Sequence, residues 1–185
     1  MINNNIPFPH HDVVMKFQKQ LEKIQVALFD VDGILTDGRV YWDGNEVGFN
    51  RFYHVRDGYG LKLMQEMGIK VGIISGGNSV GLIKRFENLK IDFFYYGNED
   101  KRKAYLEIKE KVNLSDEHFL YMADEHFDLP ILNKVGLSIT VADAPWAIRN
   151  QVHYITEKNS GMGAVREVVD LFLYLKKFSP KIEQF

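Results

Sequence analysis

Short apolar runs alternate with amphipathic stretches along most of the chain. The runs carry few polar interruptions, which is typical of strands buried on both faces of a sheet. The stretches between them repeat apolar residues at helical spacing. The predicted strands span 24–29, 70–74, 92–95, 119–123, 137–141 and 153–155, and the predicted helices span 12–24, 58–67, 78–88, 101–111, 128–134, a short segment after Pro145, and 164–176. This order predicts an α/β fold with a single doubly wound, mostly parallel sheet wrapped by helices.

One segment, at about residues 39–55, departs from this pattern. Aromatic or branched residues alternate there with polar ones around the turn sequence Asp-Gly-Asn at 43–45. Such alternation about an Asp-Gly turn predicts an inserted β-hairpin. No linker or repeat interrupts the rest, so we expect one domain over 1–185, with the hairpin as a small cap and no large cap domain. We expect the tail, 178–185, to be mobile.

Composition narrows the class of protein. The 185 residues, 45% hydrophobic and 26% charged, suit one compact globular domain. The absence of cysteine excludes thiolate catalysis and disulfides. The net charge of -2 comes from interspersed acids and bases, so we expect no nucleic-acid partner. No apolar run approaches the length of a membrane span, and we expect a cytoplasmic protein without a membrane partner.

Acidic side chains follow two of the predicted strands. Asp30 and Asp32 end the strand at 24–29, and Gly33 allows a turn that brings both carboxylates to one site. A carboxylate can attack phosphorus to form an acyl phosphate, while a second carboxyl protonates the leaving alcohol and later activates water. Two acids facing a phosphate need a hard cation such as Mg²⁺, and Asp124 can complete its site.

Groups that bind phosphate also fall near strand ends. Ser75 and Gly76 follow the strand at 70–74, where a hydroxyl and the amides of a helix-opening turn can hold phosphate oxygens. Lys101 opens the next helix and adds a positive charge. Each feature alone is usually an ordinary loop or surface residue. Together they lie in order at successive strand ends, which converge in such a sheet, and this order favours a phosphate-ester site.

The sequence Phe-Asp-Val-Asp-Gly-Ile-Leu-Thr-Asp-Gly at 29–38 resembles the first motif of the haloacid dehalogenase phosphatases. Its last four residues, with Arg-Asp-Gly-Tyr-Gly at 56–60 and Gly-Ala-Val-Arg-Glu at 163–167, are similar to the 3-deoxy-D-manno-octulosonate 8-phosphate phosphatase family over about residues 25–175. The resemblance implies a Rossmann-like haloacid dehalogenase fold. It also implies a magnesium-dependent phosphomonoesterase that acts on a sugar-acid phosphate through an aspartyl phosphate, in a step feeding lipopolysaccharide synthesis.

The resemblance also implies roles for the acids. Asp30 would be the nucleophile and a metal ligand, Asp32 the general acid/base and a ligand through its carbonyl, and Asp124 the remaining protein ligand. Asp128 would orient the site from beside them. Glu125, like Asp128, would support the metal ligands without binding the metal itself.

Phosphate binding and assembly follow from the same likeness. Ser75, Gly76 and Lys101 would anchor the phosphate. The family further implies a homotetramer in which the hairpin segments, here around 41–53, form a central barrel and cover neighbouring active sites.

Departures from the family pattern leave the substrate open. Ala123-Asp124-Glu125 stands where the family usually has Gly-Asp-Asp. Gly77 stands where the family often has arginine, and Lys84 or Arg85 can replace the contact that this removes. Two alternatives therefore remain, a phosphatase for a nonulosonate 9-phosphate and a catalytically weakened relative that serves as a binding or assembly subunit.

Several further residues are candidates for weaker roles. His54 and Arg56 near the end of the hairpin, and Arg85 and Arg166, can bind a sugar carboxylate or form structural ion pairs. His126 lies among the acids, but a histidine beside a magnesium site more often supports the ligands without touching the metal, or faces solvent, and we expect this here.

A response-regulator receiver domain is a different class that also joins acids, a hydroxyl and a lysine on a parallel sheet. In that class adjacent acids end the first strand and the phosphorylated aspartate ends the third. Here Asp30 and Asp32 stand two residues apart and Ser75 ends the next strand of the core, so the receiver pattern fits poorly.

Overall fold

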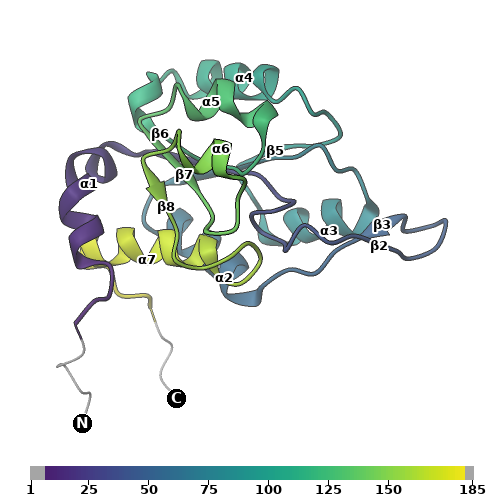
Figure 1. Ribbon diagram of the computed structural model, residues 1–185, viewed down its shortest axis with the longest axis horizontal. Helices are drawn as coiled ribbons and strands as arrows, with labels where there is room; N and C mark the ends of the chain where they lie inside the picture. The colour runs from purple at the N-terminus through teal and green to yellow at the C-terminus, as the bar shows by residue number, and fades with distance from the viewer. Residues whose placement is uncertain (1–6, 182–185) are drawn as a thin grey trace, which may run out of the picture.

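A sheet of six parallel strands forms the centre of the molecule (Figure 1) in a computed structural model that describes residues 7–181. The strand order is β5-β4-β1-β6-β7-β8. The strands are β1 (Val26–Phe29), β4 (Lys70–Ile74), β5 (Phe93–Tyr95), β6 (Phe119–Met122), β7 (Leu137–Thr140) and β8 (Tyr154–Ile155). Because the chain winds outward in both directions from β1, the predicted doubly wound parallel sheet is confirmed.

Helices cover both faces of this sheet. They are α1 (His11–Lys23), α2 (Val55–Glu66), α3 (Val80–Leu89), α4 (Arg102–Val112), α5 (Leu129–Leu132), α6 (Trp146–Arg149) and α7 (Ala164–Lys176). Alternate strand residues point to opposite faces, so Ala27 and Phe29 pack with α1, α2, α3 and α7, whereas Val26 and Leu28 pack with α4, α5 and α6. Figure 1 shows these two groups on opposite sides of the strands.

The central strand explains why the apolar runs are continuous. All four residues of β1 are fully buried because β4 and β6 flank it and helices cover both faces. Each large aliphatic or aromatic side chain buried in this way stabilises the fold by about 1.5–3 kcal/mol. This buried strand gives Asp30, the next residue, a rigid attachment point.

The hairpin stands apart from the sheet. It consists of β2 (Tyr41–Trp42) and β3 (Phe49–Asn50), which pair antiparallel. The predicted position at 39–55 is right, but only two residues on each side are paired. Its aromatic side chains, Trp42 and Phe49 among them, remain largely exposed, so within one chain no packed face extends the ladder.

Several element ends differ from the sequence prediction. α2 begins at Val55 rather than near residue 58, because extended His54 caps it and accepts a hydrogen bond from the backbone N–H of Arg56. The helix predicted at 128–134 is a 3₁₀ turn, His126–Asp128, followed by the short α5. A second 3₁₀ turn, Asp116–His118, was not predicted.

The segment after α7 is in contact with the core at its start. Phe178 packs against the core and donates its backbone N–H to Leu173. The rest of the tail expected to be mobile lies partly outside the described residues, from 182 on. Within 7–181, no helix combines the length and apolarity that crossing a bilayer requires.

Candidate active site

The residues predicted to carry chemistry meet at the carboxyl edge of the sheet. Asp30, Ser75 and Asp124 follow β1, β4 and β6, which are adjacent strands. A cavity of about 390 Å³ opens at this edge. It is called the acidic cavity below, and its lining includes these predicted residues: Asp30, Asp32, Gly76, Lys101, Asp124 and Glu125.

A turn directly after β1 shapes the floor of the acidic cavity. The backbone N–H groups of residues 34–36 all donate to the carbonyl of Val31, which folds the chain back over Asp32. Gly33 has a φ of +80°, and any Cβ there would overlap the carboxylate of Asp124. Glycine is therefore required both for the backbone conformation and for the approach of Asp124.

Lys101 forms the positive centre of the site. Its Nζ lies 2.8 Å from Asp30 Oδ2 and 2.8 Å from Asp128 Oδ1, and the side chain is only 1% exposed. Burial opposes the charge on Lys101, but the two carboxylates outweigh it and raise the pKa of the amine. The lysine is consequently charged and fixed beside the predicted nucleophile.

Negative charge nevertheless exceeds positive charge here. Asp30, Asp124 and Asp128 each offer a carboxylate oxygen, and these oxygens all lie within 4.8 Å of one another. Burial raises the pKa of Asp30 to about 7, with Lys101 opposing the shift and Asp128 adding to it. Burial, followed by repulsion from Asp30 and Asp128, raises the pKa of Asp124 to about 8. Such a cluster favours a bound cation.

The available oxygens suit a hard metal ion. Asp124 Oδ1 is buried without a hydrogen-bond partner. Asp128 is already engaged, since its Oδ1 accepts from the hydroxyl of Tyr121 at 2.5 Å and pairs with Lys101. Asp30 and Asp124 line the acidic cavity and Asp128 does not, so the first two are the carboxylates that fit Mg²⁺, whose preferred ligands are oxygens. Asp128 holds Lys101 in place instead.

Glu125 is turned toward its own chain rather than toward the cluster. Its carboxylate accepts from the backbone N–H of His126 at 2.8 Å and lies 2.6 Å from the ring Nδ1 of the same residue. With Asp128, whose Oδ2 accepts from the backbone N–H of Glu125 at 3.3 Å, it forms a capping box at the start of the 3₁₀ turn. The hydrogen bonds from His126 lower the pKa of Glu125. The His126 side chain is 64% exposed, as expected for a residue that faces solvent.

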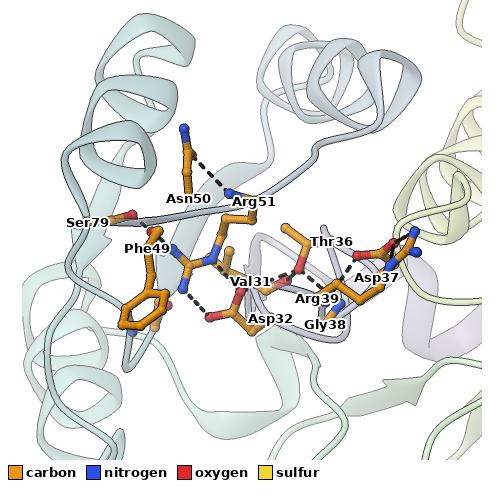
Figure 2. Close-up of polar contacts among 12 residues, drawn as sticks. Val31, Asp32, Thr36, Asp37, Gly38, Arg39, Phe49, Asn50, Arg51 and Ser79 are labelled. Carbon is orange, nitrogen blue, oxygen red and sulfur yellow. Dashed lines mark hydrogen bonds and ion pairs between the residues drawn. The ribbon is translucent and has the colours of Figure 1, made fainter. Parts of the chain in front are cut away.

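A contact that the sequence did not predict holds Asp32. Figure 2 shows the guanidinium of Arg51, from the end of the hairpin, against both carboxylate oxygens of Asp32. Arg51 Nε donates to Oδ1 at 2.5 Å and Nη2 donates to Oδ2 at 2.8 Å. Arg51 lies in the segment that the family resemblance assigns to a subunit interface. Its positive charge among aromatic residues was the one feature of the sequence that could have indicated a role at the site.

The predicted phosphate anchors occupy different depths. Gly76 lines the acidic cavity. Ser75 is 1% exposed, and its Oγ accepts from the backbone N–H of Gly77 at 3.1 Å. With Lys101, Ser75 lines a neighbouring cavity of about 200 Å³. The backbone turn, rather than the hydroxyl, is therefore what this conformation presents at the acids.

The weaker candidates for substrate contact lie elsewhere. His54, Arg56, Arg85 and Arg166 do not line the acidic cavity. His54 caps α2, Arg85 lies over the ring of Tyr53 at 5.6 Å, and Arg166 pairs at 2.7 Å with an aspartate on its own helix. The structure thus gives three of these side chains structural contacts, and their substrate roles stay predictions.

Comparisons with known proteins identify relatives of this chain. A family model described as haloacid dehalogenase-like hydrolase matches residues 94–169. The 3-deoxy-D-manno-octulosonate 8-phosphate phosphatase of Haemophilus influenzae is 36% identical over 156 residues, covering 84% of this chain and 86% of the relative. The Escherichia coli K12 enzyme of the same name is 38% identical over 162 residues, covering 88% and 84%.

Solved structures give the same match. The Moraxella catarrhalis 3-deoxy-D-manno-octulosonate 8-phosphate phosphatase, determined with a magnesium ion, a phosphate ion and a KDO molecule, superposes with a TM-score of 0.81 at 32% identity. The match covers 86% of this chain and 91% of that one. The cobalt-bound Haemophilus influenzae enzyme superposes with a TM-score of 0.80 at 35% identity, covering 85% and 92%.

Proposed function

The chain belongs to the 3-deoxy-D-manno-octulosonate 8-phosphate phosphatase family of haloacid dehalogenase-like hydrolases, and on that premise we propose that it hydrolyses this sugar-acid phosphate with Mg²⁺. The observation that carries the proposal is the arrangement at the end of β1. Asp30 is buried against Lys101, and Asp124 directs an unpaired oxygen into the same cluster. These groups suit covalent phosphoryl transfer to a carboxylate.

Asp30 is the proposed nucleophile. Its carboxylate oxygen attacks phosphorus, and the bond from phosphorus to the sugar oxygen breaks while Asp32 gives a proton to that oxygen. Asp32 then takes a proton from water, whose oxygen attacks the aspartyl phosphate and releases inorganic phosphate. Asp30 is regenerated, so each turnover consumes one water molecule.

The surrounding residues lower the cost of bringing a phosphate dianion to Asp30. Lys101 supplies a fixed positive charge beside it, and the backbone at Gly76 offers amides to the phosphate oxygens. Asp30, Asp124 and the carbonyl of Asp32 would hold Mg²⁺, which would neutralise charge on the carboxylates and the phosphate. Asp128 keeps Lys101 in position.

The substrate assignment rests on the relatives. The curated relatives are named for 3-deoxy-D-manno-octulosonate 8-phosphate, and a solved relative holds phosphate and KDO. We place this chain at the same step of lipopolysaccharide synthesis. Gly77 leaves a nonulosonate 9-phosphate as the second candidate. Asp30, Asp32 and Lys101 are all retained, which weighs against a weakened relative that only binds.

Phosphate release from a panel of sugar-acid phosphates, with and without magnesium, tests the function. We expect selective, magnesium-dependent turnover of the octulosonate 8-phosphate and none with Asp30→Asn. Faster turnover of a nonulosonate 9-phosphate would replace the substrate. Silence of the wild type across the panel would support the binding-subunit alternative instead.

We also propose that the exposed hairpin joins subunits into a homotetramer. Trp42, Phe49 and Phe52 are more than half exposed on one small hairpin, which is unusual for a monomer surface. Trp42→Ser should lower the molar mass measured by light scattering. Trp146→Ser, which removes a similarly exposed tryptophan on α6, is the matched control and should leave the mass unchanged. A monomeric wild type would refute the assembly.

A further inference from the structure

Arg51 restrains the proposed general acid/base. Both carboxylate oxygens of Asp32 accept from its guanidinium, and the remaining nitrogen, Nη1, donates to Ser79 Oγ at 2.9 Å (Figure 2). The Arg51 side chain is only 6% exposed. A bidentate, largely buried pair of this kind is strong and geometrically specific. It fixes the orientation of Asp32 in this conformation of the protein.

This restraint conflicts with the chemistry assigned to Asp32. To protonate the leaving oxygen, the carboxyl group must carry a hydrogen on one oxygen and direct it at the substrate. A rigid guanidinium that donates to both oxygens holds the carboxyl group in the plane of Arg51. Turning the carboxyl group toward the leaving oxygen therefore breaks at least one of the two hydrogen bonds from Arg51.

Gly77 supplies the space in which Arg51 makes this contact. A Cβ atom at position 77 would lie 2.8 Å from Arg51 Nη2 and 3.0 Å from Leu82 Cδ1. Any larger residue would push the guanidinium away from Asp32. Gly77 stands where the family often has an arginine, and the space that it leaves is occupied by Arg51 from the hairpin.

Arg51 also lines a second cavity. This cavity, of about 460 Å³, shares Gly77 with the acidic cavity and is bordered by the hairpin and the start of α3. Among its lining residues within 7–181, Arg51 carries the only positive charge, and Glu46 the negative one. Lys101 is the cation of the acidic cavity. The two cavities thus meet at Gly77 and are each lined by one cation, which suits a substrate with two anionic groups such as a sugar-acid phosphate.

We propose that Arg51 exchanges partners, leaving Asp32 for the carboxylate of an acidic substrate that enters the second cavity. The exchange frees an oxygen of Asp32 to protonate the leaving alcohol, so substrates with a carboxylate switch on the acid and neutral sugar phosphates do not. Arg51 keeps all its protons, and the proton delivered comes from Asp32. The inference rests on the proposed function for its substrate class and makes Arg51 a positioning and specificity residue.

The test compares three substrates at saturating magnesium. They are the octulosonate 8-phosphate, sorbitol 6-phosphate as a neutral alkyl phosphate, and p-nitrophenyl phosphate, whose leaving group needs no proton. With Arg51→Met, we expect the ratio of kcat values for the acidic and the neutral sugar phosphate to fall about tenfold or more. The kcat ratio of the neutral alkyl phosphate to the aryl phosphate should rise, because Asp32 is free.

Two further variants separate this exchange from a structural role. Gly77→Ala should shift both ratios in the same direction as Arg51→Met, since the added methyl would lie closest to the far end of the flexible Arg51 side chain. Arg39→Met is the matched control, because Arg39 pairs with Asp37 on the same loop with its side chain 80% exposed, and it should change neither ratio. Melting temperatures confirm that each variant folds.

The outcomes divide clearly. A parallel fall of kcat for acidic and neutral alkyl phosphates in Arg51→Met would overturn the exchange and leave Arg51 as a support for Asp32. An unchanged ratio of alkyl to aryl phosphate would overturn it as well. A wild type that hydrolyses p-nitrophenyl phosphate but does not favour the acidic sugar phosphate would instead overturn the proposed substrate, while the ratio of alkyl to aryl phosphate still judges the restraint by Arg51.

Discussion

Asp124 should destabilise the protein without magnesium and stabilise it with magnesium. Without the metal, burial and repulsion from neighbouring carboxylates disfavour the charge on Asp124. Its buried Oδ1 has no hydrogen-bond partner and is available to a metal ion. Replacing it by asparagine removes the charge and keeps the shape. Asp124→Asn should therefore raise the free energy of unfolding of the metal-free protein and reduce the further gain that magnesium provides.

The size of the effect follows from the raised pKa of Asp124, about 8 against an ordinary 3.8. Between pH 3.8 and pH 7, Asp124 ionises in the unfolded chain but stays protonated in the folded protein. This difference of roughly three pH units, each worth about 1.4 kcal/mol, lowers the free energy of unfolding at pH 7 by about 4 kcal/mol. Asp124 retains some exposure and shares its repulsion with Asp30, so we expect roughly half, about 2 kcal/mol, from this substitution.

The sign with pH is also determined. A carboxyl group whose pKa is raised on folding binds its proton more tightly in the folded state, so stability falls as pH rises from about 4 to about 8. Below the ordinary pKa the penalty disappears. The advantage of Asp124→Asn should consequently shrink to less than about 1 kcal/mol at pH 5.

Urea unfolding in EDTA and in excess magnesium measures these quantities. Wild type at a hundredfold excess of magnesium over its Kd should gain about 2.7 kcal/mol, and Asp124→Asn should gain less. Glu46→Gln removes the same unit of charge from the exposed hairpin turn and serves as the control. If Asp124→Asn is no more stable than wild type in EDTA at pH 7, or gains equally from magnesium, the assignment of Asp124 is refuted.

Three other predictions concern neighbouring residues. Asp30→Asn should abolish phosphate release with an unchanged circular dichroism spectrum, because an amide cannot attack phosphorus; retained turnover would remove Asp30 as nucleophile. Gly33→Ala should lower the urea midpoint and weaken magnesium binding, measured by calorimetry, because its methyl group overlaps the Asp124 carboxylate; unchanged affinity would contradict this. Lys101→Met should move the acidic limb of the pH-rate profile to higher pH, because Lys101 holds down the pKa of Asp30; an unmoved limb would argue against that coupling.

Local sequence patterns predicted most of the fold. Continuous apolar runs located β4 at 70–74 to the residue, and the helical spacing located α7 at 164–176. These patterns are informative because burial on both faces demands uninterrupted apolar residues, whatever the rest of the chain does. The hairpin position was also predictable from its turn, whereas its short ladder was not, because pairing length depends on what packs against the strands.

The set of residues that meet at the acidic cavity was likewise predictable from their order at strand ends. The contacts that each acid makes there were not. Asp128 and Glu125 have their oxygens engaged by Tyr121 and His126, while Asp124 has one left over. That difference depends on side chains brought together by folding, so no spacing in the sequence reports it.

The sequence by itself determined the class of fold, the family and the set of acids beside a lysine, because strand periodicity and a contiguous motif are properties of neighbouring residues. Only the tertiary structure decided that Arg51 pairs with Asp32, that Gly77 makes room for it, and that burial raises the pKa of Asp30. The physical reason is that ion pairing, close approach and desolvation depend on distances between segments far apart in the chain.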